Sequence, residues 1–309
     1  MLAKRVLTGA IAVGAGVLAY ASLIERNAFS VRRESLDILE PGAEPIRVLH
    51  LSDLHLAPWQ TRKIDWVRSL TDLNPDLVIA TGDMLGHVEA LPALRSALAP
   101  FAGIPGLYVH GSNDYFGPTF PNPLEYLWKP SSDREHGEPL DTPRLEDLYT
   151  TLGWMNLNNS SGRITVNGSA LLVAGTDDAH LNRERFDVLA GSVDATLEGA
   201  TTPVSAVIGV THAPYRRVLN FLTTLGADAI FAGHTHGGQV CVPGIGALTT
   251  NSDLPVALAK GVSVWNHQGR SAFLNVSAGI GTSIFAPVRF ACPPEAVLVT
   301  LRARDFGYS

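Results

Sequence analysis

Residues 46–53 read IRVLHLSD and residues 76–83 read DLVIATGD, two short β-branched apolar runs that each end in a polar cluster. Runs of this length are too short for a helix and are typical of buried strands. A stretch with apolar residues at helical spacing, TRKIDWVRSLTDL at 61–73, lies between them. The alternation of strand and helix patterns predicts an α/β fold.

The same pattern recurs along the chain, with helix-like segments between several of the runs. One segment departs from it: residues 115–141 are rich in proline, aromatic and charged residues and have no clean period, which predicts an insertion or long loop. The further strand-like runs are GLYVHGSND (106–114), ALLVAGTDD (170–178), SAVIGVTH (205–212), DAIFAGHTH (228–236), AFLNVSAG (272–279) and AVLVTL (296–301).

Composition narrows the class of protein. The 309 residues are 46% hydrophobic and 17% charged, which indicates a folded chain with a sizeable core. The net charge of -6 and the absence of a basic stripe argue against nucleic acid as a partner. The two cysteines, Cys241 and Cys292, lack the spacing of a thiolate metal site, and a disulfide between them is possible but not implied.

The N-terminus carries a targeting or anchoring element. Lys4 and Arg5 precede an uncharged run from Val6 to Ile24, about the length that a helix needs to cross a bilayer. Small residues around Ala19 to Ala21 also fit a signal-peptide cleavage site, so residues 1–25 are predicted as a transmembrane anchor or a signal segment. We expect the protein at the cell membrane through a single N-terminal span, or exported after cleavage. A polar linker is predicted at 26–45 and the catalytic domain at 46–309.

Polar side chains follow five of the predicted strands at the point where each strand ends. Ligands of α/β proteins bind at the carboxyl ends of strands, so these side chains are expected to converge on one place. They are Asp53, His55, Asp83, Asn113, Asp114, His212, His234 and His236.

Asp, Asn and His together suit divalent metals such as manganese, iron or zinc. One tetrahedral site needs about four ligands, and this set is large enough for two ions that share a bridging carboxylate. Two metals about 3.5–4 Å apart are suited to in-line displacement at phosphorus. The sequence therefore predicts hydrolysis of a phosphate ester or anhydride.

These residues also form recognisable motifs. The chain resembles the calcineurin-like metallophosphoesterase superfamily over about residues 46–301, and its end at 275–301 is similar to a bacterial subgroup with an N-terminal membrane or export segment. The motifs are Asp53-x-His55, Gly82-Asp83, Gly111-Ser112-Asn113-Asp114, Thr211-His212 and Gly233-His234-Thr235-His236.

The resemblance implies a sandwich of two mostly β sheets flanked by helices, with two divalent ions at its edge. It implies that Asp53, His55 and His236 hold the first metal, and that His212 and His234 hold the second together with an amide oxygen. Asp83 would bridge the two ions, and a hydroxide that bridges them would attack phosphorus. Asp83, Asn113 and Asp114 are the predicted catalytic residues.

The third motif departs from the family pattern of Gly-Asn-His followed by an acid. Strict alignment puts Ser112 at the ligand position, whereas a shift of one residue puts Asn113 there. We favour Asn113 because its amide oxygen is the matching donor. In either case the usual proton-donating histidine is missing.

The substrate is predicted to be a phosphorylated small molecule or a lipid-linked phosphate. Two other functions stay open. One is a pyrophosphohydrolase of a nucleotide-linked lipid, and the other is a binding module that keeps its metals without catalysis. The sequence does not predict an oligomeric state.

Overall fold

The computed structural model describes residues 2–119, 137–200 and 202–305, and within them all side chains except those of residues 2–4, 6, 7 and 10. Residues 120–136 of the predicted insertion lie outside the described residues. At its two ends, Phe116 and Pro139 form an antiparallel bridge that brings the chain back to the body of the protein.

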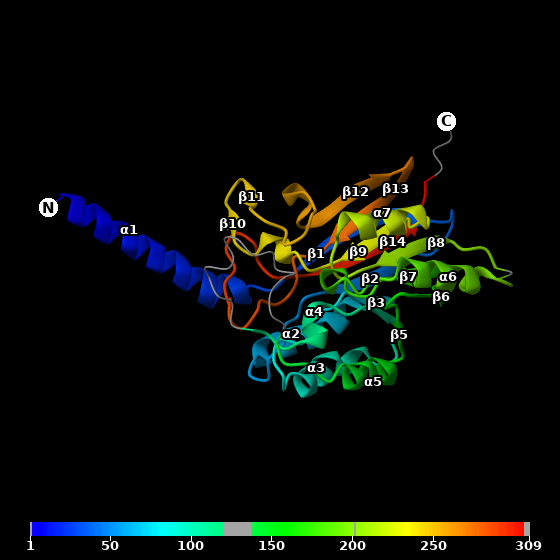
Figure 1. Ribbon diagram of the computed structural model, residues 1–309, viewed down its shortest axis with the longest axis horizontal. Helices are drawn as coiled ribbons and strands as arrows, with labels where there is room; N and C mark the ends of the chain where they lie inside the picture. The colour runs from blue at the N-terminus through cyan, green and yellow to red at the C-terminus, as the bar shows by residue number, and fades with distance from the viewer. Residues whose placement is uncertain (1, 120–136, 201, 306–309) are drawn as a thin grey trace.

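Two six-stranded sheets make up the centre of the molecule (Figure 1). Within the first sheet, β2 to β5 run parallel, β14 runs antiparallel to β2, and β1 runs parallel to β14. The strand order of the first sheet is β1 (Ser30–Leu39), β14 (Glu295–Ala303), β2 (Ile46–Leu51), β3 (Leu77–Ala80), β4 (Gly106–Tyr108) and β5 (Trp154–Asn156).

The second sheet has a parallel centre with one antiparallel strand at each edge. Its order is β12 (Gly261–His267), β13 (Arg270–Val276), β9 (Ala229–Ala232), β8 (Ala206–Val210), β7 (Ser169–Gly175) and β6 (Ser160–Val166). A small hairpin of β10 (Cys241–Val242) and β11 (Gly246–Ala247) stands apart from both sheets.

Helices cover the outer faces of the two sheets (Figure 1). Helices α2 (Thr61–Ser69), α3 (Leu91–Leu98) and α5 (Thr142–Leu152) pack on the first sheet, while α6 (Phe186–Leu197) and α7 (Arg216–Thr224) pack on the second. Apolar side chains of both sheets, such as Val48, Ile79, Ile208 and Phe231, are fully buried between them. The prediction of an α/β protein with two main sheets flanked by helices is confirmed.

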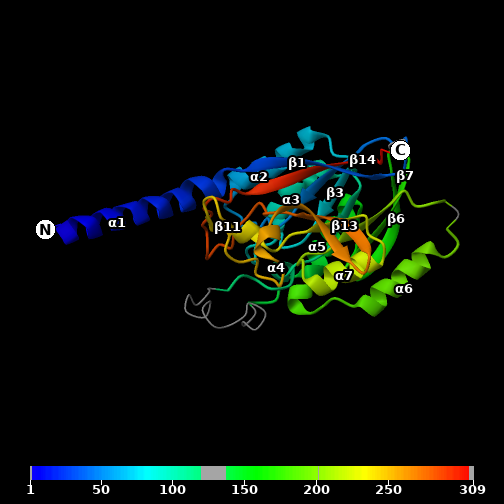
Figure 2. The same cartoon turned by 90° about the horizontal axis from the view of Figure 1, so that it is seen from above.

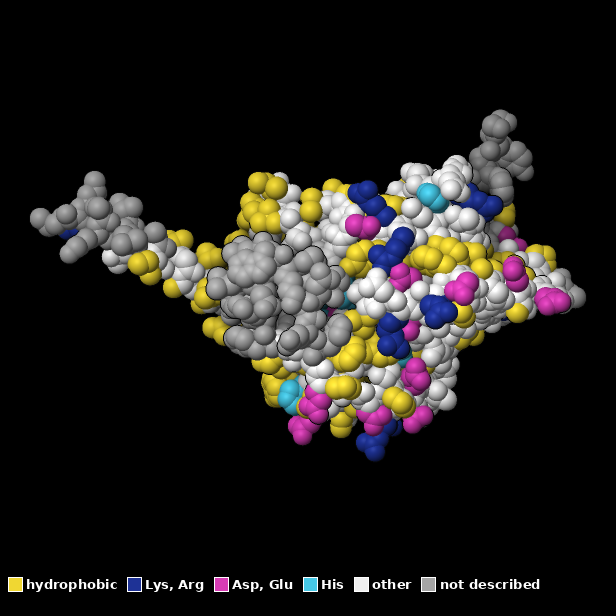
Figure 3. Space-filling model, in the orientation of Figure 1, with side chains coloured by type: hydrophobic (Ala, Val, Ile, Leu, Met, Phe, Trp, Pro, Cys, Tyr) yellow, Lys and Arg dark blue, Asp and Glu magenta, His cyan; other side chains and the backbone are white. Residues whose placement is uncertain are grey.

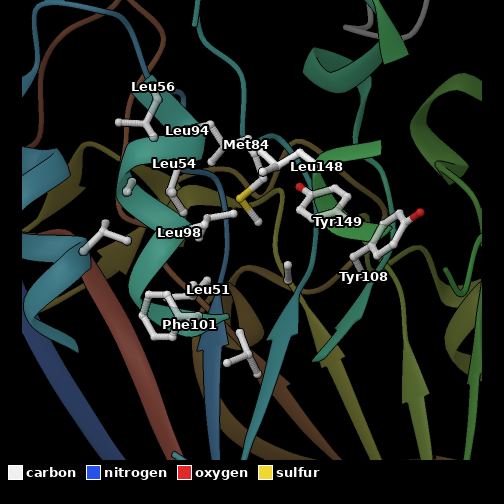
Figure 4. Close-up of a cluster of buried hydrophobic side chains, with 14 of the residues drawn as sticks. Leu51, Leu54, Leu56, Met84, Leu94, Leu98, Phe101, Tyr108, Leu148 and Tyr149 are labelled. Atoms are coloured by element: carbon white, nitrogen blue, oxygen red, sulfur yellow. The ribbon is translucent and has the colours of Figure 1, made fainter. Parts of the chain in front are cut away.

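The core under the first sheet anchors the loops that carry the predicted metal ligands. Leu54 lies between Asp53 and His55, and Met84 follows Asp83; both the leucine and the methionine side chains are fully buried in this cluster. Figure 4 shows them packed with Leu94 and neighbouring side chains of α3 and α5. Burial of these anchors fixes the positions of the polar residues beside them.

Residues 26–45 are part of the fold, where the sequence analysis predicted a linker. Strand β1 occupies half of this segment and pairs along its length with β14. Leu36, Ile38 and Leu39 are buried in the core between the sheets. The polar character of the segment comes partly from the exposed side chains of this edge strand, Ser30, Arg33, Ser35 and Asp37.

The N-terminal helix α1 (Leu2–Ala19) continues into the π-helical turn η1 (Tyr20–Ile24) and the 3-10 turn η2 (Glu25–Asn27). It projects from the body of the molecule in both ribbon views (Figures 1 and 2). Among the helices whose side chains the structure describes, none is both long and apolar enough to cross a membrane. The predicted transmembrane anchor at residues 1–25 is therefore not confirmed.

Candidate metal centre

The predicted ligands meet where the carboxyl ends of strands from both sheets come together. Asp53 follows β2 and Asp83 follows β3, while His212 and His234 follow β8 and β9 of the second sheet. Hydrogen bonds tie these loops to one another, including Asp53 N–H to Gly82 O at 3.0 Å and Gly233 N–H to His212 O at 2.9 Å. The site thus lies across the junction of the two sheets.

The backbone at this site is strained. Asp53, His55, Asp83, His234 and His236 all have positive φ angles, between 39° and 68°. Residues other than glycine rarely adopt this conformation, and it costs about 1–3 kcal/mol each where it occurs. Strain concentrated at five neighbouring polar residues indicates a functional site.

One glycine is required by close packing at the site. A Cβ atom at Gly233 would lie 2.6 Å from Asp53 Oδ2, inside van der Waals contact. The absence of a side chain therefore lets the β9 turn approach Asp53, and His234 N–H donates to that carboxylate at 3.1 Å.

A first group of side chains surrounds one point between the sheets. Potential ligand atoms of Asp53, His55, Asp83 and His236 all lie within 4.8 Å of one another. His236 Nε2 is 3.4 Å from Asp53 Oδ1, and His55 Nε2 is 3.4 Å from Asp83 Oδ2. This group could hold one metal ion.

A second group faces the other oxygen of Asp83. His212 Nε2 is 3.6 Å from Asp83 Oδ1 and 3.3 Å from His234 Nδ1. His234 and His236 therefore belong to different groups although one residue separates them. Asp83 is the residue that both groups share.

Asn113 lies against Asp83. Its backbone N–H donates to Asp83 Oδ1 and its side-chain Nδ2 donates to Asp83 Oδ2, both at 2.8 Å. Ser112 Oγ is 3.5 Å from the same amide nitrogen. Both residues lie in the short helix α4 (Ser112–Tyr115), which brings the Asn113 amide to the Asp83 carboxylate.

Asp114 is fully buried behind the site. Its carboxylate accepts hydrogen bonds from the backbone N–H groups of Asp83, Met84 and Gly111 at 2.8, 2.9 and 3.0 Å. These contacts hold the turn of Asp83 against α4. Asp114 thus lies behind the Asp83 turn as a hydrogen-bond acceptor, and the catalytic role predicted for it stays a prediction.

His110 points away from the metal centre. It is fully buried, and its Nε2 lies 3.1 Å from Glu146 Oε1. Its ring packs near Tyr108 and Tyr149. His110 therefore does not replace the proton-donating histidine of the family pattern.

Burial and charge have opposing effects on the pKa values of this cluster. Burial raises the pKa of Asp53 to about 6 and lowers that of His55 to about 4. Burial also opposes ionisation of Asp83, but His212 and His55 outweigh it and lower the pKa of this carboxyl. Burial would lower the pKa of His212, yet the carboxylates of Asp83 and Asp53 raise it to about 9.

The hydrogen-bond pattern of the histidines fits a bound cation. His212 Nδ1 donates to Thr81 O at 2.6 Å and His234 Nε2 donates to Asn251 O at 3.0 Å. If both rings are neutral, the two nitrogens that face each other, His212 Nε2 and His234 Nδ1, both carry lone pairs. A divalent cation would satisfy these lone pairs, and the carbonyls of Thr81 and Asn251 would hold the rings in place.

A further polar group lies at the same edge, in the GTDDAH turn at 175–180, where the Asp178 carboxylate accepts from His180 N–H at 2.9 Å as a turn cap. Asp178 follows β7 and is fully buried, and burial raises its pKa to about 7. The centre of the His180 ring lies 4.6 Å from that of His234, and His180 Nδ1 is 3.1 Å from Tyr215 Oη. The position of GTDDAH at a strand end was the signal that could have identified them.

Buried carboxylates and imidazoles at one edge of a two-sheet α/β protein are typical of metal-dependent phosphoesterases. Residues 46–238 match the family model of the calcineurin-like phosphoesterases, which is more than half of the chain. The protein belongs to this family. It is an enzyme that hydrolyses phosphoric esters, as the sequence predicted, and the family uses divalent metals.

The names of two relatives, a metallophosphoesterase and a pyrophosphatase, are consistent with this family. The chain is 23% identical to the uncharacterized metallophosphoesterase YkuE of Bacillus subtilis (strain 168), over 96% of this chain and 95% of YkuE. It is 22% identical to the UDP-2,3-diacylglucosamine pyrophosphatase LpxG of Chlamydia trachomatis, over 91% of each chain. Among solved structures, TT1561 of Thermus thermophilus matches 77% of this chain and 91% of its own, with 14% identity and a TM-score of 0.43.

Proposed function

We propose that the protein hydrolyses a phosphate ester or anhydride with two divalent metal ions bound at this centre. The observation that carries the proposal is the position of Asp83, which presents one oxygen to His55 and the other to His212. A carboxylate shared in this way can bridge two ions. Manganese, iron and zinc suit the oxygen and nitrogen donors of the site.

The two groups of side chains provide the ligands. Asp53, His55 and His236 would hold the first ion, and His212 and His234 the second. Asn113 would complete the second group after a rotation of its amide that turns Oδ1 toward the ion in place of Nδ2. Asp83 would bind both.

The bound ions would lower the pKa of a water molecule and neutralise charge on the phosphoryl oxygens. The chain itself orients the reacting groups. Thr81 O accepts from His212 Nδ1, which would leave the Nε2 lone pair of the neutral ring for the second ion. Because His110 is turned to Glu146, the third strand end offers no imidazole for the leaving group. Substrates with good leaving groups, such as anhydrides and aryl esters, fit this arrangement best.

A pyrophosphate of a nucleotide-linked lipid is the second candidate substrate. It is supported by the similarity to LpxG, whose name gives UDP-2,3-diacylglucosamine as the molecule it acts on. The side chains of Ile11, Val13, Val17 and Leu18 on the projecting helix are exposed. Figure 3 shows hydrophobic side chains on the surface of the coloured part of this helix. We propose that this segment brings the enzyme to the membrane surface, or that it is removed on export.

The test compares metal content and hydrolysis of bis-p-nitrophenyl phosphate by the full chain with those of Asp83→Ala. We expect about two ions in the parent, and a loss of at least roughly 100-fold in rate in the variant together with lost metal. Asp65→Ala, an exposed acid on α2, is the matched control and should behave as the parent.

The Asn113→Ala variant tests the remaining ligand. We expect weaker binding of the second metal and a rate reduced by roughly 10–100-fold. If the parent binds two ions but hydrolyses neither aryl phosphates nor nucleotide anhydrides, the metal-retaining binding module becomes the better description. If Asp83→Ala keeps both ions, the proposed bridge is wrong.

A further inference from the structure

The two cysteines of the chain are neighbours in the fold. Cys241 begins β10, and Cys292 lies in the loop before β14. Val240 and Phe290 form a parallel bridge, and Cys241 N–H donates to Phe290 O at 2.8 Å, so the two segments run side by side. This proximity is not visible in the sequence, where about 50 residues separate them.

Both thiols converge on one backbone atom. Cys241 Sγ donates to Gly237 O at 3.2 Å, and Cys292 Sγ donates to the same oxygen at 3.4 Å. Cys292 Sγ also lies 3.4 Å from His236 O, so both thiols face the same turn, His236–Gly238. Both residues are free thiols, and both are buried in a small apolar cluster with Ala278.

We propose that Cys241 and Cys292 form a reversible intramolecular disulfide. A thiolate of the pair attacks one sulfur of a small-molecule disulfide such as oxidised glutathione and releases one thiolate from it. The second cysteine then attacks the mixed disulfide and releases the second small thiol. The two cysteines lose two protons and two electrons, and the reagent is reduced to two thiols.

Access to the pair depends on the β10–β11 hairpin. Ile245 and Leu248 on this hairpin are exposed, and β10 and β11 contact each other over only two residue pairs. Short, exposed elements of this kind open more readily than the packed sheets. Opening of the hairpin would admit the reagent to sulfurs that are buried in the closed form.

The crosslink would tie the hairpin to the loop that precedes β14, next to the turn of His236. Closing a loop of about 50 residues reduces the freedom of the unfolded chain. We expect the oxidised protein to melt roughly 5–10 °C above the reduced protein. The inference does not depend on the proposed metals or substrate.

The test exposes the full chain to oxidised glutathione, digests it without reduction and searches for a Cys241–Cys292 peptide by mass spectrometry. We expect this crosslink in monomeric protein, loss of both alkylatable thiols, and return of both with a reductant. Cys241→Ser and Cys292→Ser should each form only a glutathione adduct on the remaining cysteine and lose the rise in melting temperature. Thiols that stay alkylatable after denaturation, mixed glutathione adducts at both positions, or a crosslink between two chains would each overturn the proposal.

Discussion

Asp114 holds the Asp83 turn through the backbone N–H groups of Asp83, Met84, Leu85 and Gly111, so its substitution should affect both stability and the proposed metal binding. In Asp114→Asn an amide NH₂ replaces one acceptor and leaves buried N–H groups unpaired, which costs about 1–3 kcal/mol for each group. We expect the free energy of unfolding to fall by roughly 2–4 kcal/mol and metal affinity to fall with it. Chemical denaturation and metal titration measure both, with the exposed Asp147→Asn on α5 as the control. Parent-like stability would contradict this role.

Lys63 makes the stability of the protein depend on pH. Its Nζ donates to Leu54 O at 2.8 Å, and burial, reinforced by Arg289 and Arg26, lowers its pKa from 10.5 to about 7. Between these two values the unfolded chain holds a proton that the folded chain has released, so stability rises with pH across this window. The rise from this residue should be roughly 2–4 kcal/mol.

Lys63→Met keeps the aliphatic stem and removes the titrating group. We expect the free energy of unfolding of this variant to lose the rise between about pH 7 and pH 10. Denaturation curves at several pH values measure it, and Lys260→Met, at an exposed lysine, should keep the parental slope. An unchanged slope in Lys63→Met would show that Lys63 is charged in the folded protein.

The convergence of the candidate ligands could be predicted because each of them follows an apolar run. The end of a strand determines where the residues after it lie in space. The structure brings them together. Asp178 and His180 were not recognised because a polar residue after a strand equally fits a turn. The choice between Ser112 and Asn113 could not be made from spacing, since it depends on the direction in which α4 leaves the strand.

Strand β1 is part of the first sheet although it lies before the residues that carry the family motifs. Residues 2–19 of α1 project from the body, whereas Ala21 O accepts from Arg289 N–H at 3.1 Å and Glu25 accepts from Cys292 N–H at 2.7 Å. We expect a chain without residues 1–19 to melt within about 2 °C of the full chain. A chain without residues 1–39 should lose several kcal/mol, because Leu36, Ile38 and Leu39 leave the core.

Thermal unfolding of the two truncated chains, followed by circular dichroism, distinguishes these expectations. Equal stability of both truncations would mean that β1 adds nothing to the first sheet. The sequence could not identify β1 as a strand because its partner β14 lies more than 250 residues away. Its charged residues, such as Arg32 and Arg33, also mask the alternation that an edge strand would show.

The α/β class of the whole molecule could be predicted because each strand and helix carries its own local pattern. The division into two sheets could not, because it depends on contacts between distant segments. Strand β14 enters the first sheet between β1 and β2, and β13 pairs with β9 in the second. Local periodicity contains no information on such pairings. The resemblance to a family, and not the pattern of runs, predicted the sandwich.

Metal binding should stabilise the molecule as a whole, because the proposed ligands come from both sheets. Asp53, His55 and Asp83 follow strands of the first sheet, while His212, His234 and His236 follow strands of the second. Ions bound to the folded chain alone would add about 2.7 kcal/mol at a concentration 100 times the Kd. We therefore expect chelation with EDTA to lower the melting temperature by roughly 5–10 °C.

Restoring manganese or zinc in excess of the chelator should reverse this change in the parent. Asp83→Ala should melt at the same temperature with and without metal, because the carboxylate that joins the two groups is missing. Scanning calorimetry on the full chain measures both proteins under identical conditions. A parent protein whose melting temperature is indifferent to EDTA, while its metal is shown to be removed, would mean that the ions do not link the two sheets.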